Sequence, residues 1–450
     1  MKLKIKKSNL SSLLLLTLFL ETMMTLRSNS IKMNDKQLNA LSFNKKSRII
    51  GLTKEQLLAN DLRNIAFECI EIEKLKKIFA DIILKNIKDL DFSEFIEYPK
   101  FYIKERYLKK TINSSNISGL NIVSVDGSSV VKNFMNVDFS FLKAIAVKYY
   151  FYKNHAADIR YYPDLSGFNY YSVQGNYVNR EENIVENKIS MDMKFMEINL
   201  LNNMIKCSND VNIDLIIIDG SIVIMPINLL FSQDPEISKE YDRLLKEYHK
   251  LYLNCKENGI ILIGSIKDTR TSALCHLVRD SIQLLKPNSS NLSDFIKINY
   301  RQIIDYLSDL DLFNKILNKS ERSCIFNCKR DIDKIRDTGI KKEIPYYFPL
   351  SFYAFYLKTA KYDTPCRIEF FMEENHLLKK ASEKADLISS IILPISSLNK
   401  YYGLPIPQIE AHKRAVFKPD EINLLFNSLM RTLNEHGVEL LEKRRNRRPF

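Results

Sequence analysis

Glycine is scarce in this sequence, with 11 residues among 450. Neither of the common glycine-rich phosphate loops is present, since we find no GxxxxGK[ST] and no GxGxxG. These absences argue against ATP hydrolysis by the chain itself.

The cysteines form no recognisable framework. There are seven, an odd number, and they are scattered along the chain. The one close pair, Cys324 and Cys328, has no second pair to complete a zinc site. We interpret the cysteines as reduced thiols and expect a cytoplasmic protein.

A membrane-spanning run is also lacking. The basic residues 1–8 and the apolar run LLLLTLFL (13–20) imitate a signal peptide. However, Glu21 interrupts the run, no A-x-A-like site follows, and the run is too short to span a bilayer. We therefore interpret residues 1–33 as an N-terminal extension and expect no stable membrane association.

Positive charge is abundant, because the formal net charge is +13. A strongly basic chain favours a polyanionic partner, either nucleic acid or a membrane surface. The sequence ends in EKRRNRRPF, a basic tail suited to phosphate contacts. A generally lysine-rich composition and a merely solvated terminus are the plain alternatives.

Hydrophobic periodicity predicts an α/β fold with a mixed central sheet flanked by helices. Residues 34–118 have a mostly helical pattern, residues 119–428 combine strands with helices, and residues 290–345 resemble a helical insertion. Residues 429–450 are expected to form a C-terminal helix and the basic tail. The expected strands lie at 122–125, 141–152, 168–179, 215–218, 260–266 and 346–371, and the expected helices at 191–206, 234–257, 376–398 and 418–442.

One short phrase occurs twice, as IVSVDGSS (122–129) and LIIIDGSI (215–222). In each, a buried apolar run leads into Asp-Gly-Ser, so Asp126 and Asp219 are predicted to end two central strands. A lone buried carboxylate is costly, and two carboxylates on adjacent strands could share a divalent cation such as Mn²⁺ or Mg²⁺. The alternative is that each aspartate binds its own turn.

A third ligand is expected on the helix over 191–206. Glu197 lies there within the apolar stretch FMEINLL, and Asp192 is the second choice. Carboxylates supplied by strand, helix and strand are typical of RNase H-like nucleases, in which divalent ions activate water against a phosphodiester. Glu197 at the edge of an amphipathic face is the plain alternative.

Five segments, taken together and in this order, resemble the NurA nuclease domain. The resemblance extends from about residue 120 to about residue 425, whereas residues 155–190 do not align well. The five segments are the two DGS phrases, GSIKDTRTS (264–272), FYLKTAKYDTPCRIEFF (355–371) and GLPIPQIEAHKRAV (403–416).

The resemblance implies an RNase H-like, manganese-dependent nuclease that acts on single- and double-stranded DNA. It implies 5′–3′ exonuclease and single-strand endonuclease activity, a homodimer, and work with a HerA-like hexameric translocase in DNA end resection and repair. A non-catalytic DNA-binding subunit of such a translocase complex and an RNA-directed nuclease of the same fold remain alternatives.

The resemblance also implies roles for individual residues. Asp126, Glu197 and Asp219 would be metal ligands. Lys267 would stabilise phosphate charge, and His412 would move protons or complete the metal shell. Arg270 and Arg367 are predicted to contact DNA, and Arg367 could instead pair with Glu369.

Overall fold

The structure, a computed structural model, comprises two compact units, Met1–Glu71 and Ile72–Phe450. The first unit contains the N-terminal part of helix α3 (Lys54–Lys85), and the second unit contains all other described elements. The predicted extension over 1–33 lies outside the described residues. Described residues are 54–98, 100–135, 137–153, 157–164, 171–177, 182–206, 212–224, 234–285, 303–304, 306–328, 351–372, 378–441 and 443.

The second unit is built around a mixed sheet of 11 strands, which confirms the predicted fold class. Its strand order is β1-β8-β10-β11-β7-β6-β2-β3-β4, while β5 pairs with β3 and β9 pairs with β10. The central pairs β2–β6 and β6–β7 are parallel, and the remaining pairs are antiparallel. The strands are β1 (Lys109–Thr111), β2 (Asn121–Asn133), β3 (Val137–Phe151), β4 (Ala157–Tyr162), β5 (Tyr171–Tyr177), β6 (Leu215–Asp219), β7 (Ile261–Ile266), β8 (Glu321–Ser323), β9 (Phe326–Asn327), β10 (Ser351–Lys358) and β11 (Cys366–Met372).

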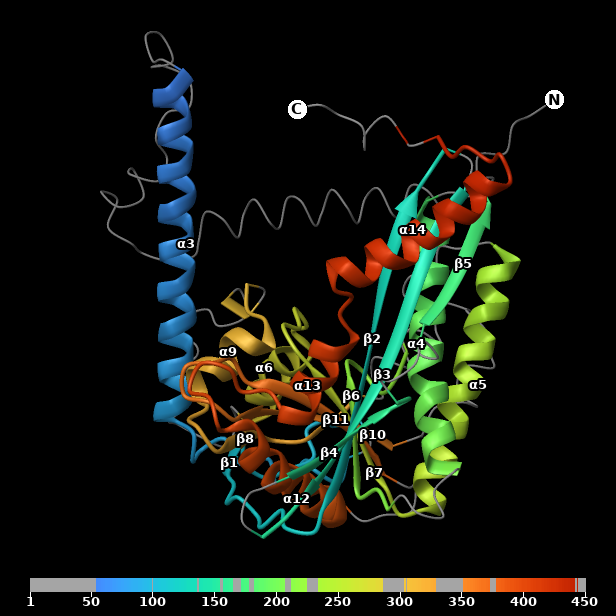
Figure 1. Cartoon of the computed structure of the whole chain (residues 1–450). Helices are drawn as coiled ribbons and strands as arrows, with labels where there is room; N and C mark the ends of the chain where they lie inside the picture. Colours follow the sequence, from blue (N-terminus) through green and yellow to red (C-terminus); the bar gives the residue numbers. More distant parts are fainter. Residues whose placement is uncertain are drawn as a thin grey trace, which may run out of the picture. The chain divides into compact units, whose positions relative to one another are not determined.

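Helices cover both faces of the sheet (Figure 1). One face packs against the end of α3 and against α4, α5, α6 and α9, and the other packs against α12 and α13. The α5 helix begins where Asp234 accepts a hydrogen bond from the Glu236 amide. The further helices are α4 (Glu182–Lys206), α5 (Pro235–Glu257), α6 (Ala273–Leu285), α9 (Asp309–Ile316), α12 (Leu378–Ser396), α13 (Ile406–Ala415) and α14 (Pro419–Glu435).

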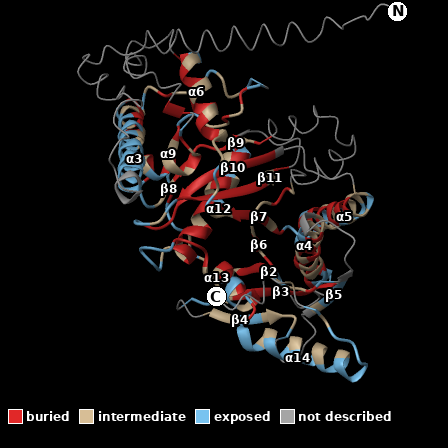
Figure 2. Ribbon diagram, turned by 90° about the horizontal axis from the view of Figure 1, so that it is seen from above, coloured by how far each residue is buried: buried red, intermediate tan, exposed pale blue. Residues whose placement is uncertain are grey.

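The central strands β6 and β7 are mostly apolar, as expected for strands that are covered on both faces. In β6, Ile216 and Ile218 face one helical layer, while Leu215 and Ile217 face the other. Figure 2 shows this burial in the middle of the sheet, in contrast with α14, which has no buried residue. No helix in the described part of the chain combines the length and apolarity needed to cross a membrane.

Several elements differ from the sequence prediction. The described part of the expected insertion, residues 303–304 and 306–328, contains helix α9 and also the short strands β8 and β9. Strand β4, which was not predicted, pairs antiparallel with β3. Strand β1 joins the sheet from within the region expected to be helical, because it pairs with β8.

Candidate metal centre

The two aspartates of the repeated phrase lie side by side on parallel strands. Val125 of β2 is in register with Ile218 of β6, so Asp126 and Asp219 follow at the same level of the sheet. Both are shielded, since Asp126 is 8% exposed and Asp219 is intermediate. The sheet thus places two carboxylates next to each other, as the sequence predicted.

The backbone around the two aspartates is nevertheless different. Asp219 is the last residue of β6, and Gly220 follows with φ of +112°, a conformation that favours glycine. Asp126, in contrast, lies within β2, which continues to Asn133 because it stays paired with β3. The prediction that Asp126 ends its strand is therefore wrong.

A histidine from α13 completes a group of possible ligands. His412 Nδ1 lies 2.7 Å from Asp126 Oδ2. Asp126, Asp219 and His412 each offer one ligand atom, and these atoms all lie within 4.8 Å of one another. Carboxylate oxygens with one imidazole nitrogen suit a divalent cation such as manganese.

Glu197 approaches the same place from α4, and it is completely buried. Its Oε2 accepts a hydrogen bond from Lys194 Nζ at 2.6 Å, and its Oε1 has no hydrogen-bond partner. Lys194 Nζ also donates to the carbonyl oxygen of Asp219 at 3.3 Å. An unpartnered buried carboxylate oxygen is costly, and a bound cation would satisfy it. Asp192, the second choice on this helix, interacts with Glu240 and Lys188 instead.

Lys267 reaches the centre from the end of β7. Its Nζ lies 2.6 Å from Asp219 Oδ2, and the side chain is 27% exposed. Burial lowers the pKa of Lys267, but the Asp219 carboxylate outweighs burial and raises it overall. Lys267 is therefore a fixed positive charge at the rim of the site.

The crowding of acids changes their proton affinity. Burial, followed by the charge of Asp219, raises the pKa of Asp126 against the opposing contact with His412. Burial raises the pKa of Glu197 to about 7, although the neighbouring Lys194 works in the opposite direction. Clustered carboxylates with raised pKa values would be stabilised in their charged form by a divalent cation.

The two predicted DNA-contacting arginines lie in different surroundings. Arg270 is exposed in the loop after Lys267. Arg367 has a side chain that is only 9% exposed, and its Nη2 pairs with Glu369 Oε1 at 2.8 Å. This burial argues against a DNA contact for Arg367 and agrees with the ion-pair interpretation.

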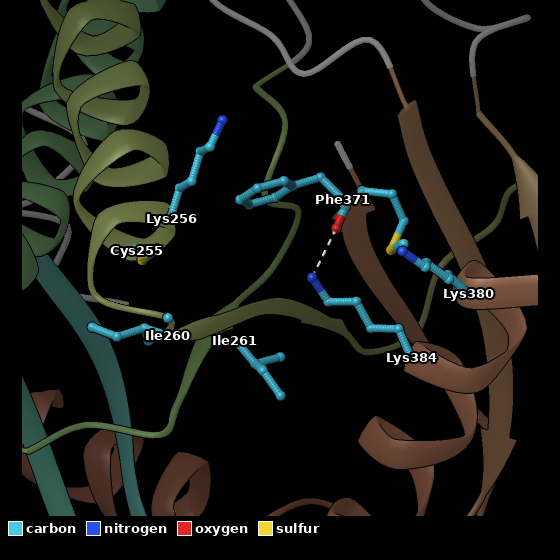
Figure 3. Close-up of a pocket in the computed structure, with 9 residues that line it drawn as sticks. Cys255, Lys256, Ile260, Ile261, Phe371, Lys380 and Lys384 are labelled. Atoms are coloured by element: carbon cyan, nitrogen blue, oxygen red, sulfur yellow. Dashed lines mark hydrogen bonds between the residues drawn. The ribbon is translucent and has the colours of Figure 1, made fainter. Parts of the chain in front are cut away.

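A cavity of about 280 Å³ lies at the opposite end of β7 (Figure 3). Lys384 borders it and donates to the Phe371 carbonyl oxygen at 3.1 Å. None of the clustered carboxylates, His412 or Lys267 lines this cavity. The candidate metal centre therefore lies at the other end of β7, away from this cavity. The lining residues are Cys255, Lys256, Gly259, Ile260, Ile261, Phe371, Met372, Lys380 and Lys384.

The sequence reasoning missed three residues around the centre. Lys194 lies one helical turn before Glu197, and this spacing was the signal that both share one face. Ser265 and Gln408 are completely buried, and Ser265 Oγ lies 2.8 Å from Gln408 Oε1. Gln408 precedes His412 by one turn of α13, so this contact fixes α13 against β7.

Fold and site together define an α/β protein with a carboxylate-and-histidine centre fitted for a divalent cation. Residues 120–417 match the family model of the NurA domain, and the chain belongs to this family. The resemblance predicted from the five segments is thereby confirmed. A search of curated proteins finds no match.

Solved NurA structures are similar to this chain at low sequence identity. The NurA nuclease from Sulfolobus solfataricus is 14% identical, with a TM-score of 0.47 over 86% of this chain and 98% of that one. A structure of NurA with manganese is 13% identical, with a TM-score of 0.35 over 80% and 98%. A structure of NurA bound to dAMP and manganese is 12% identical, with a TM-score of 0.36 over 82% and 96%.

Proposed function

We propose that this chain is a divalent-metal-dependent DNA nuclease that hydrolyses phosphodiester bonds. The observation that carries the proposal is the group of ligand atoms from Asp126, Asp219 and His412 within 4.8 Å of one another. Membership of the NurA domain family supports it. The net charge of +13 supports a nucleic acid as substrate.

The residues present fit a cation. Asp126, Asp219 and His412 would hold it, and Glu197 would join them through the oxygen that now lacks a partner. We propose manganese as the ion, with magnesium as the alternative, because carboxylate oxygen ligands suit both and the NurA resemblance implies manganese. When bound, the cation would polarise the phosphodiester and activate a water molecule.

Lys267 acts beside the ligands, and His412 offers a second role besides holding the cation. Lys267 Nζ, held by Asp219, places positive charge where negative charge develops on the phosphate. His412 is bound to Asp126 through Nδ1, and its side chain is 55% exposed. Its Nε2 is therefore the atom that exchanges protons with substrate or solvent.

The family resemblance supports further proposals about the direction of cleavage, the strandedness of the substrate and the partners. We propose 5′–3′ exonuclease and single-strand endonuclease activity in DNA end resection and repair. The chain would work in the cytoplasm as a homodimer with a HerA-type hexameric translocase. Arg270, exposed beside Lys267, is the residue proposed to contact the DNA backbone.

Cleavage of labelled single- and double-stranded DNA in manganese, magnesium or EDTA tests the proposal. Wild type would be compared with Asp126→Asn and Asp219→Asn. Asp158→Asn is the matched control, because Asp158 is a β4 aspartate whose side chain is 42% exposed and pairs with Arg160. We expect metal-dependent cleavage by wild type and Asp158→Asn, and its loss in the two cluster variants.

Other outcomes would replace the proposal. If wild type never cuts, alone or with a HerA-type translocase, the chain is a non-catalytic DNA-binding subunit. If it cuts RNA in preference to DNA, it is an RNA-directed nuclease of the same fold. If the cluster variants cut normally, the ligand assignment is wrong.

A further inference from the structure

A buried ion pair lies beside the turn that follows Asp219. Glu369 and Arg367 belong to β11, and they are 2% and 8% exposed. Arg367 Nη2 lies 2.8 Å from Glu369 Oε1. In the sheet, Glu369 is in register with Gly264 of the adjacent strand β7. The pair is thus separated from Asp219 of β6 only by β7.

The Glu369 carboxylate binds the turn directly. Its Oε2 accepts a hydrogen bond from Ser221 Oγ at 2.6 Å and a second from the Ile222 amide at 3.3 Å. Ser221 Oγ in turn accepts from the Val223 amide at 3.1 Å. One carboxylate oxygen of Glu369 therefore holds two successive residues, Ser221 and Ile222, of the turn that follows Asp219.

The turn reaches Glu369 because β7 leaves room for it. A Cβ at Gly264 would lie 2.6 Å from the Gly220 carbonyl oxygen and 2.9 Å from the Ile222 nitrogen. The Gly220 amide also donates to the Ser265 carbonyl oxygen at 3.0 Å. The backbone after Asp219 is therefore laid across β7 and held at its far side by Glu369.

We propose that Glu369 is a positioning residue for the metal ligand Asp219, with Arg367 as the counterion that holds Glu369 in place. The proposal rests on the metal centre of the proposed function. A buried ion pair is weak evidence for a stabilising role, because apolar residues of similar volume often serve stability equally well. Its placement on the Asp219 turn indicates a role in ligand geometry, since residues that orient metal ligands affect metal affinity.

Manganese affinity, measured by isothermal titration calorimetry, tests the proposal independently of cleavage. The variant Arg367→Met/Glu369→Leu removes both charges at similar volume, and Ser221→Ala removes one donor while leaving the ion pair intact. We expect the double variant to bind manganese about 10- to 100-fold more weakly and Ser221→Ala to shift in the same direction. Adding Ser221→Ala to the double variant should cause no further loss, because both changes break one link.

The chain offers a control in Arg322, which is completely buried and pairs with both Glu105 and Asp386 at 2.6 Å. Arg322→Met/Glu105→Leu should bind manganese like wild type. Thermal unfolding and circular dichroism would confirm that all variants are folded. If the Arg367 and Glu369 double variant does not fold, Ser221→Ala alone decides.

The outcomes separate this proposal from the proposed function. The positioning role alone would be overturned if manganese binding is lost in Asp219→Asn but unchanged in a folded Arg367→Met/Glu369→Leu variant. If that double variant does not fold, unchanged manganese binding by Ser221→Ala would overturn the positioning role. Absence of manganese binding by wild type would overturn the metal centre and the positioning role with it. Equal weakening in the Arg322 control would also overturn the proposal, because the effect would then be a general consequence of losing a buried ion pair.

Discussion

Gly127 leaves the space that Glu197 occupies. A Cβ at position 127 would lie only 2.7 Å from Glu197 Oε1 and 2.8 Å from Met193 Cγ. Helix α4 therefore packs against β2 at a distance that only glycine permits. The Asp-Gly-Ser phrase at 126–128 needs its glycine for this close approach, whereas Gly220 of the second phrase is needed for its positive φ.

This contact predicts the effect of Gly127→Ala. The added methyl group would displace Glu197 from the cluster, and we expect manganese affinity to fall roughly 10-fold or more. Gly175→Ala is the control, since a Cβ there meets no atom closer than 3.8 Å. Calorimetric titration of both variants checks the prediction. Equal manganese affinity in the two variants would mean that Glu197 is not a ligand.

The pKa of Glu197, about 7, predicts that manganese binding depends on pH. Below pH 7 the carboxyl group is protonated and must release its proton to bind a cation, so affinity should decrease as the pH falls through 7. Titration calorimetry in buffers of different ionisation enthalpy would measure the released proton. In Glu197→Gln this part of the proton release should disappear, and its persistence would contradict the assignment.

The same shift predicts how the metal-free protein responds to pH. Burial raises the pKa of Glu197 from 4.5 to about 7, so the folded state holds this proton more tightly than the unfolded state. The proton on Glu197 therefore stabilises the folded state. This contribution to the free energy of unfolding, about 3 kcal/mol, is complete below pH 4.5 and is lost as the pH rises through 7. Denaturant unfolding at pH 5 and pH 8 would test this. The difference between wild type and Glu197→Gln isolates it from other groups.

His412 is expected to matter for cleavage but little for folding. Its Nδ1 is bound to Asp126, while its side chain is 55% exposed. We expect His412→Ala to lower the cleavage rate by about 100-fold or more, the usual range for lost proton transfer, with unchanged thermal stability. His436→Ala is the control, because His436 is exposed at the end of α14 and its Nδ1 lies 2.9 Å from the Thr432 carbonyl oxygen. Similar rates for both variants would exclude a role for His412.

The contact between Ser265 and Gln408 is predicted to act through His412. Ser265→Ala removes the hydroxyl that lies 2.8 Å from Gln408 Oε1, so α13 loses a fixed point on β7. We expect a lower cleavage rate in Ser265→Ala, and no further decrease when it is combined with His412→Ala. Ser281→Ala is the control, since that buried hydroxyl bonds within its own helix to the Leu277 carbonyl oxygen. Additive losses would show that Ser265 acts elsewhere.

The sequence was sufficient for the central strands and for the paired aspartates. A continuous apolar run such as LIIID indicates a strand buried on both faces, and an aspartate at its end stands out. It was not sufficient for the course of β2 after Asp126, because the residues SSVVKN are held in the sheet by β3, a partner that local pattern does not reveal.

The surroundings of the site were harder still to predict. Arg367 was expected to contact DNA, yet it is turned inward, because the charge that compensates it is two residues away on the same strand face. Glu369 and Ser221 are 148 positions apart, and Ser265 and Gln408 are 143 apart. Contacts of this kind depend on how strands and helices are ordered in space, which a single sequence does not disclose.

The separation of Asp126 and His412, 286 positions along the chain, has a consequence for biosynthesis. Domains are made from the N-terminus onward, so both aspartates and Glu197 leave the ribosome well before α13 does. The ligand group cannot close until α13 has emerged and packed on the sheet. If the chain is the proposed nuclease, it would therefore cut no DNA until α13 has packed on the sheet.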